Sequence, residues 1–186
     1  MPKLLHKTKY LSLFKTKQGF IFAQRRNINS TAILCFKKVK GKYFFLIRYQ
    51  PLPVVNTIKH FKWNDCFACP ITGSLENKQA PISNAIAEVY EEANIKINKK
   101  HIVASAKFVP TTQMNETVFC FLVNVTGIKP INKKQGDGSI FEDVSYNKWL
   151  SLEQVKKIIN KENDKLYLSS LAICFNMFVN TYGKIK

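Results

Sequence analysis

Hydrophobic and polar positions alternate along the first third of the chain with the two-residue period of β-strands. Residues 10–26 alternate polar and aromatic side chains around Gly19, which indicates a hairpin. Residues 31–39 and 42–49 are rich in β-branched and aromatic residues and are separated by a Lys-Gly pair, a second hairpin signal. The chain is therefore expected to open with strands.

A helical period replaces this alternation in the middle of the chain. Residues 61–71 predict another strand and residues 72–80 a loop. A helix is predicted over 81–93, since Pro81 suits a first helical turn. The apolar residues of this helix lie on one stripe at the 3.6-residue period, namely Ile82, Ala85, Ile86, Val89 and Ala93.

The remaining sequence predicts two more strands and two helices. The strands are expected at 102–109 and 116–125. Residues 151–154 form a capping box ahead of a helix at 155–161, and a largely apolar helix is expected at 166–179. Strands with one internal helix and two C-terminal helices predict an α/β (α+β) sandwich, and 186 residues suit one domain.

The chain is strongly basic, with a net charge of +17. Almost all of this charge is lysine, because the chain has three arginines. A basic surface attracts nucleic acids and other polyanions without selecting one of them. The charge therefore indicates affinity for anions and leaves the ligand open.

The five cysteines are an odd set that lies mostly in apolar runs, so reduced, buried thiols are expected. Cys66 and Cys69 form a single CxxC, but no second CxxC or suitably spaced histidine pair completes a zinc site. No apolar run approaches the roughly 20 residues of a membrane span, and Met1 is followed by no signal-like block. A cytoplasmic protein is expected.

Three glutamates of the predicted helix carry the main indication of chemistry. Glu88, Glu91 and Glu92 are spaced i, i+3 and i+4, off the apolar stripe and fifteen residues or more behind Gly73. Like charges at this spacing repel one another, so the group suggests a divalent cation that compensates them. The alternative is the solvated face of an amphipathic helix.

The segment 73–95 resembles the signature of the Nudix hydrolases: a glycine, five residues, Glu, seven residues, Arg-Glu, an aliphatic residue, any residue, Glu-Glu, any residue, Gly and an aliphatic residue. Six positions are in register, namely Gly73, Glu88, Val89, Glu91, Glu92 and Ile95. Three positions depart, with Gln79 for the first glutamate, Ala87 for the arginine and Asn94 for the last glycine. Asparagine tolerates the left-handed conformation, whereas the other two changes remove an acid and a base together.

The resemblance implies a Nudix-like α/β/α sandwich with a mixed sheet, preceded by a small N-terminal antiparallel sheet. It extends over about residues 20–155 and is closest to the ADP-ribose pyrophosphatase-like branch. Residues 45–53 look like the strand end where an arginine, here Arg48, reaches substrate phosphate in that branch. Residues 109–116 are similar to a loop of the branch that ends in a glutamate.

The resemblance also implies a cofactor, Mg²⁺ or Mn²⁺. The expected ligands are three carboxylates and one backbone carbonyl, from Glu88, Glu91, Glu92 and Thr72. Glu91 and Glu92 thereby belong to the catalytic group together with Glu142, a loop glutamate expected to help deprotonate the attacking water. An exposed loop acid is the alternative for Glu142, with Asp137 and Asp143 as substitutes if the loop register differs.

Two parts of the single domain, 1–28 and 29–186, are expected to differ in role. The first is an N-terminal hairpin that, in the branch, exchanges between subunits, so the resemblance implies a homodimer; the second is the core. Further contacts with substrate are expected from residues of both parts, namely Arg25, Arg26, Arg48, Glu116, Phe22 and Gly73. Phe20 and Trp63 join Phe22 as stacking candidates, with a place in the core as the preferred alternative for all three.

The expected function is hydrolysis of the pyrophosphate of a nucleoside diphosphate linked to another moiety, with ADP-ribose favoured and AMP and ribose 5-phosphate as products. One alternative is a catalytically weakened module of the same fold that binds a nucleotide or RNA, with RNA not favoured. The other is the same chemistry on NADH, a sugar nucleotide or capped RNA.

Overall fold

The computed structural model describes residues 1–57, 60–76, 78–131, 143–160 and 166–183. Within these ranges the strands form a three-stranded antiparallel sheet and a seven-stranded mixed sheet. The small sheet contains β1 (Lys3–Lys7), β2 (Leu11–Lys15) and β3 (Ile21–Arg25). The large sheet contains β4 (Ser30–Val39), β5 (Lys42–Pro51), β6 (Cys66–Cys69), β7 (Ile71–Ser74), β8 (Ile102–Phe108), β9 (Val118–Asn124) and β10 (Tyr146–Ser151). The helices are α1 (Pro53–Asn56), α2 (Pro81–Ala93), the 3₁₀ turn η1 (Lys99–His101), α4 (Leu152–Ile159) and α5 (Ser169–Tyr182).

Strand β4 is the centre of the large sheet, whose order is β10-β5-β4-β9-β8. It pairs with β5 antiparallel and with β9 in parallel. The β4–β5 hairpin turns at Lys40 and Gly41, both with positive φ, as the sequence predicts. The parallel partner, β9, comes from far along the chain and lies on the side of β4 opposite to β5.

The single strand predicted over 61–71 is wrong, because the chain forms two short strands there. β6 pairs with the end of β5, and β7 pairs with the beginning of β4. Pro70 lies between them and has no N–H to donate to a ladder, which accounts for the break. The chain thus pairs with β5 through β6 and then with β4 through β7, just before the loop that leads to α2.

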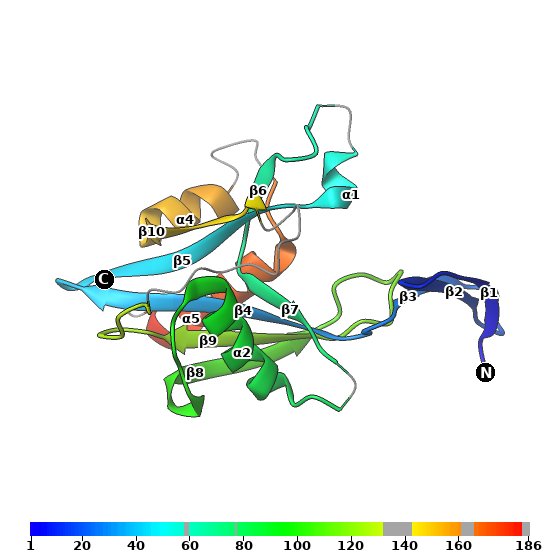
Figure 1. Cartoon of the computed structure of the whole chain (residues 1–186), viewed down its shortest axis with the longest axis horizontal. Coiled ribbons are helices and arrows are strands. Elements are labelled where there is room, and N and C mark those ends of the chain that lie inside the picture. Colours follow the sequence, from blue (N-terminus) through cyan, green and yellow to red (C-terminus); the bar gives the residue numbers. More distant parts are fainter. Residues whose placement is uncertain (58–59, 77, 132–142, 161–165, 184–186) are drawn as a thin grey trace.

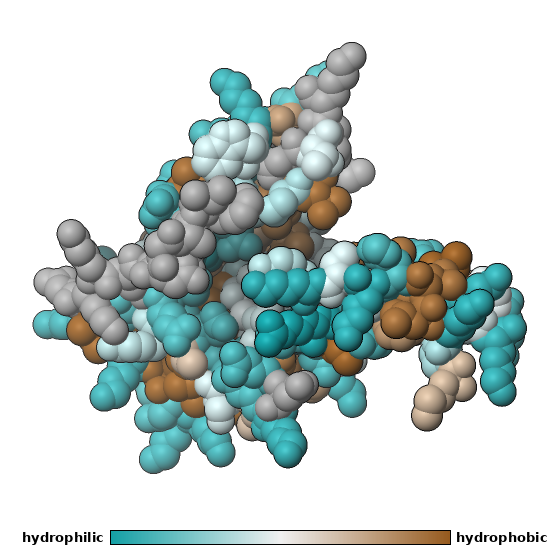
Figure 2. Space-filling model, turned by 45° about the vertical axis from the view of Figure 1, so that its right-hand side comes forward, coloured by the Kyte–Doolittle hydropathy of each residue, from teal (hydrophilic) through white to brown (hydrophobic). Residues whose placement is uncertain are grey.

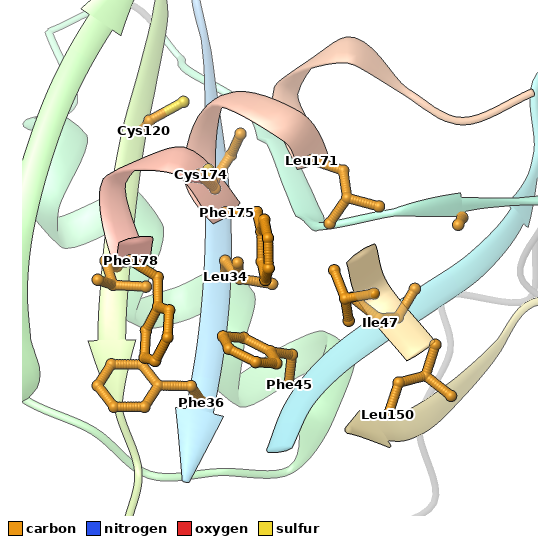
Figure 3. Packing of buried hydrophobic residues seen from close by; sticks show 14 of the residues in the cluster. Leu34, Phe36, Phe45, Ile47, Cys120, Leu150, Leu171, Cys174, Phe175 and Phe178 are labelled. Atoms are coloured by element: carbon orange, nitrogen blue, oxygen red, sulfur yellow. Dashed lines mark hydrogen bonds between the residues drawn. The ribbon is translucent and has the colours of Figure 1, made fainter. Parts of the chain in front are cut away.

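Helices cover both faces of the large sheet, with α2 on one face and α5 and α4 on the other (Figure 1). Successive residues of β4 face opposite sides, so Leu34 packs on the α5 side and Ile33 on the α2 side. Figure 3 shows Phe45 and Phe178 packed between β5 and α5. Their rings are perpendicular, with centroids 4.7 Å apart.

The predicted bounds of the central helix are confirmed. α2 begins at Pro81 and ends at Ala93, and Asn94 caps it in the left-handed conformation with φ 57°. The N–H of Asn94 donates to the carbonyl of Tyr90. Asparagine thus takes the backbone conformation for which glycine is usual at this position.

The three-stranded sheet, which we call the arm, projects from one end of the molecule (Figure 1). The predicted hairpin is confirmed as β2 and β3, with Gly19 at φ 93°, and β1 adds a strand that the sequence pattern did not reveal. The arm is joined to the body where the N–H of Ala23 donates to the carbonyl of Gln113 at 2.8 Å. Across the described residues, every helix falls short of the length and apolarity required to cross a membrane.

Replacing Phe178 by alanine should lower the unfolding free energy by roughly 3–5 kcal/mol, because a ring that is 2% exposed leaves a cavity behind. Urea unfolding followed by circular dichroism measures this loss. Val179→Ala is the matched control on the same helix, since Val179 is 38% exposed and should change stability by only about 0.5 kcal/mol. Equal losses for both variants would show that the α5 face is not buried as described.

Candidate active site

Glu88 lies directly against the main chain of Gly73. A Cβ atom added at residue 73 would overlap the carboxyl group of Glu88, so any other residue there would push this side chain out of its present position. β7 brings Gly73 to this point through its pairing with Thr31 of β4, and α2 brings Glu88. The structure thus joins the first and the central positions of the predicted signature.

Asn84 ties the same elements together and was not singled out by the sequence analysis. Its side chain is 4% exposed, and its Oδ1 accepts from the hydroxyl of Thr31 at 2.5 Å. Its Nδ2 donates to the carbonyl of Ser74 at 3.2 Å and to Oε1 of Glu88 at 3.3 Å. The available signal was its position four residues before Glu88, one helical turn away on the same side of α2.

The pKa of Glu88 is raised from 4.5 to about 7. Burial is the main cause, followed by the charges of Glu91 and Glu92, while the hydrogen bond from Asn84 and the charge of Arg48 act in the opposite direction. The three glutamates are therefore close enough to repel one another. Glu88 and Glu92 are half-buried and Glu91 is exposed, so a fully solvated helix face describes Glu91 and not the other two.

Arg48 of β5 is 8% exposed and forms an ion pair with Glu92, with Nη2 lying 2.5 Å from Oε2. Its Nε donates to Oε1 of Gln50 at 3.1 Å, which fixes the guanidinium along the strand. On the neighbouring strand β10, Nδ2 of Asn147 donates to the backbone carbonyl of Glu92 at 2.5 Å. The end of α2 is thus held by two adjacent strands, and the predicted contact of Arg48 with substrate phosphate stays a prediction.

Gln79 and Ala87 can now be compared with the residues that the signature expects. Oε1 of Gln79 accepts from the N–H of Glu76 at 3.2 Å and from Nδ2 of Asn84 at 3.3 Å, so its amide organises the loop before α2. Ala87 has no charge to offer the glutamates. Arg48, from a different element, supplies a guanidinium to one of them.

The donor set of this site fits a hard divalent cation in kind, because such ions prefer carboxylate and carbonyl oxygens. A cation would also relieve the repulsion that contributes to the raised pKa of Glu88. In the described part of the chain, however, no three histidine, cysteine, aspartate or glutamate side chains converge as a ready metal site. Glu92 in particular is turned toward Arg48.

A cavity of about 320 Å³ lies beside this site, between the arm and the body. Its lining includes Thr72 and Gly73 of β7, Arg25 of the arm and Glu116. Nη2 of Arg25 lies 2.6 Å from Oε1 of Glu116, which also accepts from the hydroxyl of Ser30 at 2.6 Å. Four residues predicted as ligand contacts from distant parts of the sequence are thus brought together.

Other predicted contacts lie farther out. Phe22 stacks on Phe14 within the arm, with ring centroids 5.5 Å apart, and Arg26 lines a second hollow of about 250 Å³ on the arm. Phe20 and Trp63 are 46% and 56% exposed, so their preferred place in the core is wrong. The predicted catalytic Glu142 and its substitute Asp137 lie outside the described residues, and Asp143 is exposed.

Cys66 and Cys69 belong to β6 and are unpaired thiols, as expected. Burial raises the pKa of Cys69 to about 12, so this thiol stays protonated. Sγ of Cys66 donates to the carbonyl of Val144 at 3.4 Å. The CxxC is therefore accounted for by strand packing.

Of two known structures compared with this chain, the first supports the fold. A structure described as an ADP compounds hydrolase aligns with a TM-score of 0.58 over 99% of this chain and 97% of that chain, at 10% sequence identity. A C. elegans Ap4A hydrolase, solved as a binary complex, aligns with a TM-score of 0.47 over 83% of this chain and 98% of that chain, at 18% identity. A scan against protein-family models and a search of curated proteins found no match.

The chain has the predicted Nudix-like fold. The mixed sheet between helices and the small N-terminal antiparallel sheet are both present, as the sequence analysis expects. At these identities the likeness concerns the fold, and the chemistry has to be argued from this chain's own residues.

Stability should depend on pH through Glu88. Because its pKa is about 7 in the folded chain against an ordinary 4.5, the folded state holds a proton more tightly. The stabilising contribution of this proton is complete below pH 4.5 and is lost as the pH rises through about 7. Thermal unfolding in EDTA at pH 5 and pH 8 measures the loss, and Glu88→Gln should remove it and stabilise the chain at pH 8.

The matched control for this prediction is Glu153→Gln, because the side chain of Glu153 is 70% exposed. Its pH profile should follow that of the parent chain. A parent and a Glu88→Gln profile that run parallel from pH 5 to pH 8 would contradict the raised pKa.

The Arg48–Glu92 pair should show strong coupling in a double-mutant cycle. Arg48→Met alone should cost roughly 3–5 kcal/mol, since it leaves a partly buried carboxylate without its cation. Adding Glu92→Gln should recover part of this loss, as measured by urea unfolding at pH 8. The exposed Lys156–Glu153 pair is the control cycle, with an expected coupling below about 1 kcal/mol; equal coupling in both cycles would refute a structural role for Arg48.

Proposed function

We propose that the chain is a hydrolase of the pyrophosphate in a nucleoside diphosphate linked to another moiety, with ADP-ribose as the favoured substrate. The observation that carries the proposal is the carboxylate of Glu88, seated on the backbone of Gly73 and repelled by Glu91 and Glu92. A chain gains no stability from gathering these charges, so the arrangement is best explained by a charged ligand.

The proposed cofactor is Mg²⁺ or Mn²⁺. Glu88, Glu91, Glu92 and the backbone carbonyl of Thr72 would hold it, since all four lie on α2 or on β7 beside it. When bound, the cation would neutralise charge on the diphosphate and make water a better nucleophile. Glu88 must be deprotonated to take part, so a cation and a proton would compete for its carboxylate, and cation binding should become weaker as the pH falls below about 7.

The protein's own side chains would hold the proposed cation ligands in place and accept a proton from water. Arg48 holds Glu92 at the end of α2, and Asn84 holds Glu88 at Gly73. Glu142 is proposed as the carboxylate that accepts a proton from water as its oxygen bonds to phosphorus. The anhydride P–O bond then breaks, and the departing phosphate takes the electron pair, giving AMP and ribose 5-phosphate from ADP-ribose.

Three features support a nucleotide-type substrate. The cavity of about 320 Å³ lies within the range of small-molecule pockets, roughly 300–1,000 Å³. Phosphate groups would be attracted by a chain of net charge +17, and Arg25 reaches the cavity from the arm. The structural neighbour of TM-score 0.58 is described as a hydrolase of ADP compounds, which agrees with this substrate class.

The proposed homodimer would use the arm. Its apolar side chains are exposed and gather on the projecting sheet (Figure 2). The side chains concerned are 39–48% exposed: Leu4, Leu5, Leu11, Phe20 and Ile21. A second copy of the chain covering them would bury this area.

The cytoplasmic location is likewise proposed, and the five unpaired cysteines agree with a reducing compartment.

Hydrolysis should be tested with purified chain and Mg²⁺ or Mn²⁺ at pH 8, over ADP-ribose, NADH, a dinucleoside polyphosphate, a sugar nucleotide and capped RNA. We expect turnover of ADP-ribose, with AMP and ribose 5-phosphate detected by chromatography. Glu88→Gln and Glu92→Gln should lower kcat by at least about 100-fold, since each removes a proposed cation ligand. Glu153→Gln, which changes a side chain that is 70% exposed, is the control that should keep full activity.

An absence of turnover on every substrate, with either ion, would refute the hydrolase. Binding of RNA with a steep salt dependence would then favour the binding-module alternative. Turnover of another substrate in the panel, with the same loss in Glu92→Gln, would support the proposed reaction and show that ADP-ribose is not the favoured substrate.

A further inference from the structure

The charge of the chain is unevenly divided along its length. Residues 1–64 contain 14 lysines and arginines and no aspartate or glutamate. Residues 65–186 contain 15 lysines and arginines and 12 acidic residues. Lysine is therefore spread along the whole chain, but only the first third lacks the acids that would offset it. Such an asymmetry within one chain points to a polyanion as the partner of the basic part.

The arm belongs to this basic part. Residues 1–28, which contain the arm, include seven lysines and arginines. Glu116 of the body contacts the arm, and its charge is offset by Arg25 at 2.6 Å. No carboxylate of the described residues forms an ion pair with any of the other six. Within the described part of the chain, most of the positive charge of the arm is thus left for a ligand.

The strand register sorts the side chains of the arm onto two faces. One face contains two neighbouring rows of residues that lie opposite one another across the three strands, namely Leu4, Phe14 and Phe22, and then Lys7, Ser12 and Gln24. Leu13 and Ile21 alternate with these residues and lie on the other face. The proposed homodimer can use that other face, where Ile21 is 47% exposed.

A hollow of about 250 Å³ lies on the first of these faces. Five of the six residues of the two rows line it, together with Lys9, Tyr10 and Arg26. The hollow therefore combines cations, aromatic rings and polar side chains, and no described acid lines it. Figure 2 shows the same mixture on the arm, with hydrophilic side chains around the hydrophobic ones.

The turn between β1 and β2 presents its side chains from an ordered backbone. The hydroxyl of Thr8 accepts from the N–H groups of Tyr10 and Leu11 at 3.2 and 2.9 Å. The N–H of Arg26 donates to the carbonyl of Tyr10 at 2.9 Å, so these two residues are neighbours at the end of the hairpin. Tyr10 is nevertheless 67% exposed, and Nζ of Lys9 lies 5.2 Å from the centroid of its ring. An exposed ring and two cations thus meet at one hollow.

Exposed aromatic rings beside cations are what proteins use to bind single-stranded nucleic acid, because bases stack on the rings and phosphates attract the cations. We propose that the hollow of the arm binds single-stranded nucleic acid. Tyr10 stacks on a base, and Lys7, Lys9 and Arg26 contact phosphates of the backbone. The hollow is smaller than the roughly 300–1,000 Å³ of pockets that enclose a whole small molecule, so it suits one unit of a longer strand.

The polar side chains of the hollow favour nucleic acid over an anionic membrane. Ser12 and Gln24 line the hollow and can form hydrogen bonds with the edge of an unpaired base, whereas acyl chains offer them no partner. In a duplex, the faces of the bases are covered by their neighbours, so a ring such as that of Tyr10 has no base to stack on. A single strand leaves these faces free.

This binding goes beyond the proposed hydrolysis and does not require it. The hollow lies on the arm, whereas Glu88 and Gly73 lie on α2 and β7. An oligonucleotide with a free 5′-hydroxyl contains no pyrophosphate, so in EDTA it cannot act as a substrate of the proposed reaction. The two proposals can therefore fail independently.

Fluorescence anisotropy of a 3′-labelled oligouridine of about 12 nucleotides, titrated with the intact chain in EDTA, tests the proposal. Replacing Lys7, Lys9 and Arg26 together by glutamine should weaken binding at least about tenfold at low salt. The slope of log K against log salt should become shallower by about 2, since each phosphate contact of a single strand contributes about 0.7. The matched control removes the same charge from the connection between α2 and β8, by glutamine at Lys96, Lys99 and Lys100, and should bind nearly as the parent does.

The role of the ring has its own pair of variants. Tyr10→Ala should weaken binding by about fivefold or more, because it removes a stacking surface. Tyr10→Phe keeps the ring and should keep the affinity. Circular dichroism of each variant checks that the chain is folded.

Each outcome supports or overturns the proposal. Equal weakening by the two triple variants would assign the affinity to the net charge of the chain and overturn the site on the arm. Full affinity in Tyr10→Ala, or equal binding of a duplex, would overturn the stacking of an unpaired base. Binding to vesicles of phosphatidylserine and phosphatidylcholine through the same cations, without binding of oligouridine, would replace nucleic acid by a membrane. Glu88→Gln should bind oligouridine as the parent does, and a loss of binding there would move the site away from the arm.

Discussion

The absence of a side chain at residue 73 is the constraint on which the site depends. The carboxyl group of Glu88 occupies the space where a Cβ would stand, so the loop and the helix meet through backbone and carboxylate rather than through two side chains. This contact removes water from the carboxylate of Glu88. The charges of Glu91 and Glu92 make the ionised form of that carboxylate still less favourable. The fold keeps an electrostatic cost at this position, as is common at functional sites, and this cost is the reason why the site is proposed here.

A buried amide makes the contact possible. Asn84 bonds to β4, to β7 and to its own helix, so the strand that delivers Gly73 and the helix that delivers Glu88 are fixed to one another. Such a network raises the penalty for small displacements, because each shift breaks several hydrogen bonds at once. The contact between Gly73 and Glu88 is therefore held rigidly, and Arg25 ties the arm to the body through its ion pair with Glu116.

Much of the fold could be predicted from the sequence where local signals were strong. Pro81 and Asn94 defined α2, and the capping box at Ser151 is present, although α4 begins at Leu152 and not at the predicted residue 155. The division of 61–71 into β6 and β7 was missed because the apolar run hides a change of partner strand that only tertiary pairing reveals. The three glutamates were found by their spacing, whereas Asn84 was not, since its significance lies in hydrogen bonds with residues distant in sequence.

The pairing of Arg48 with Glu92 has a consequence for residue 87. Because the guanidinium that meets the carboxylate of Glu92 comes from strand β5, the helix needs no basic side chain of its own to offset that charge. The helix position at residue 87 can therefore be as small as alanine.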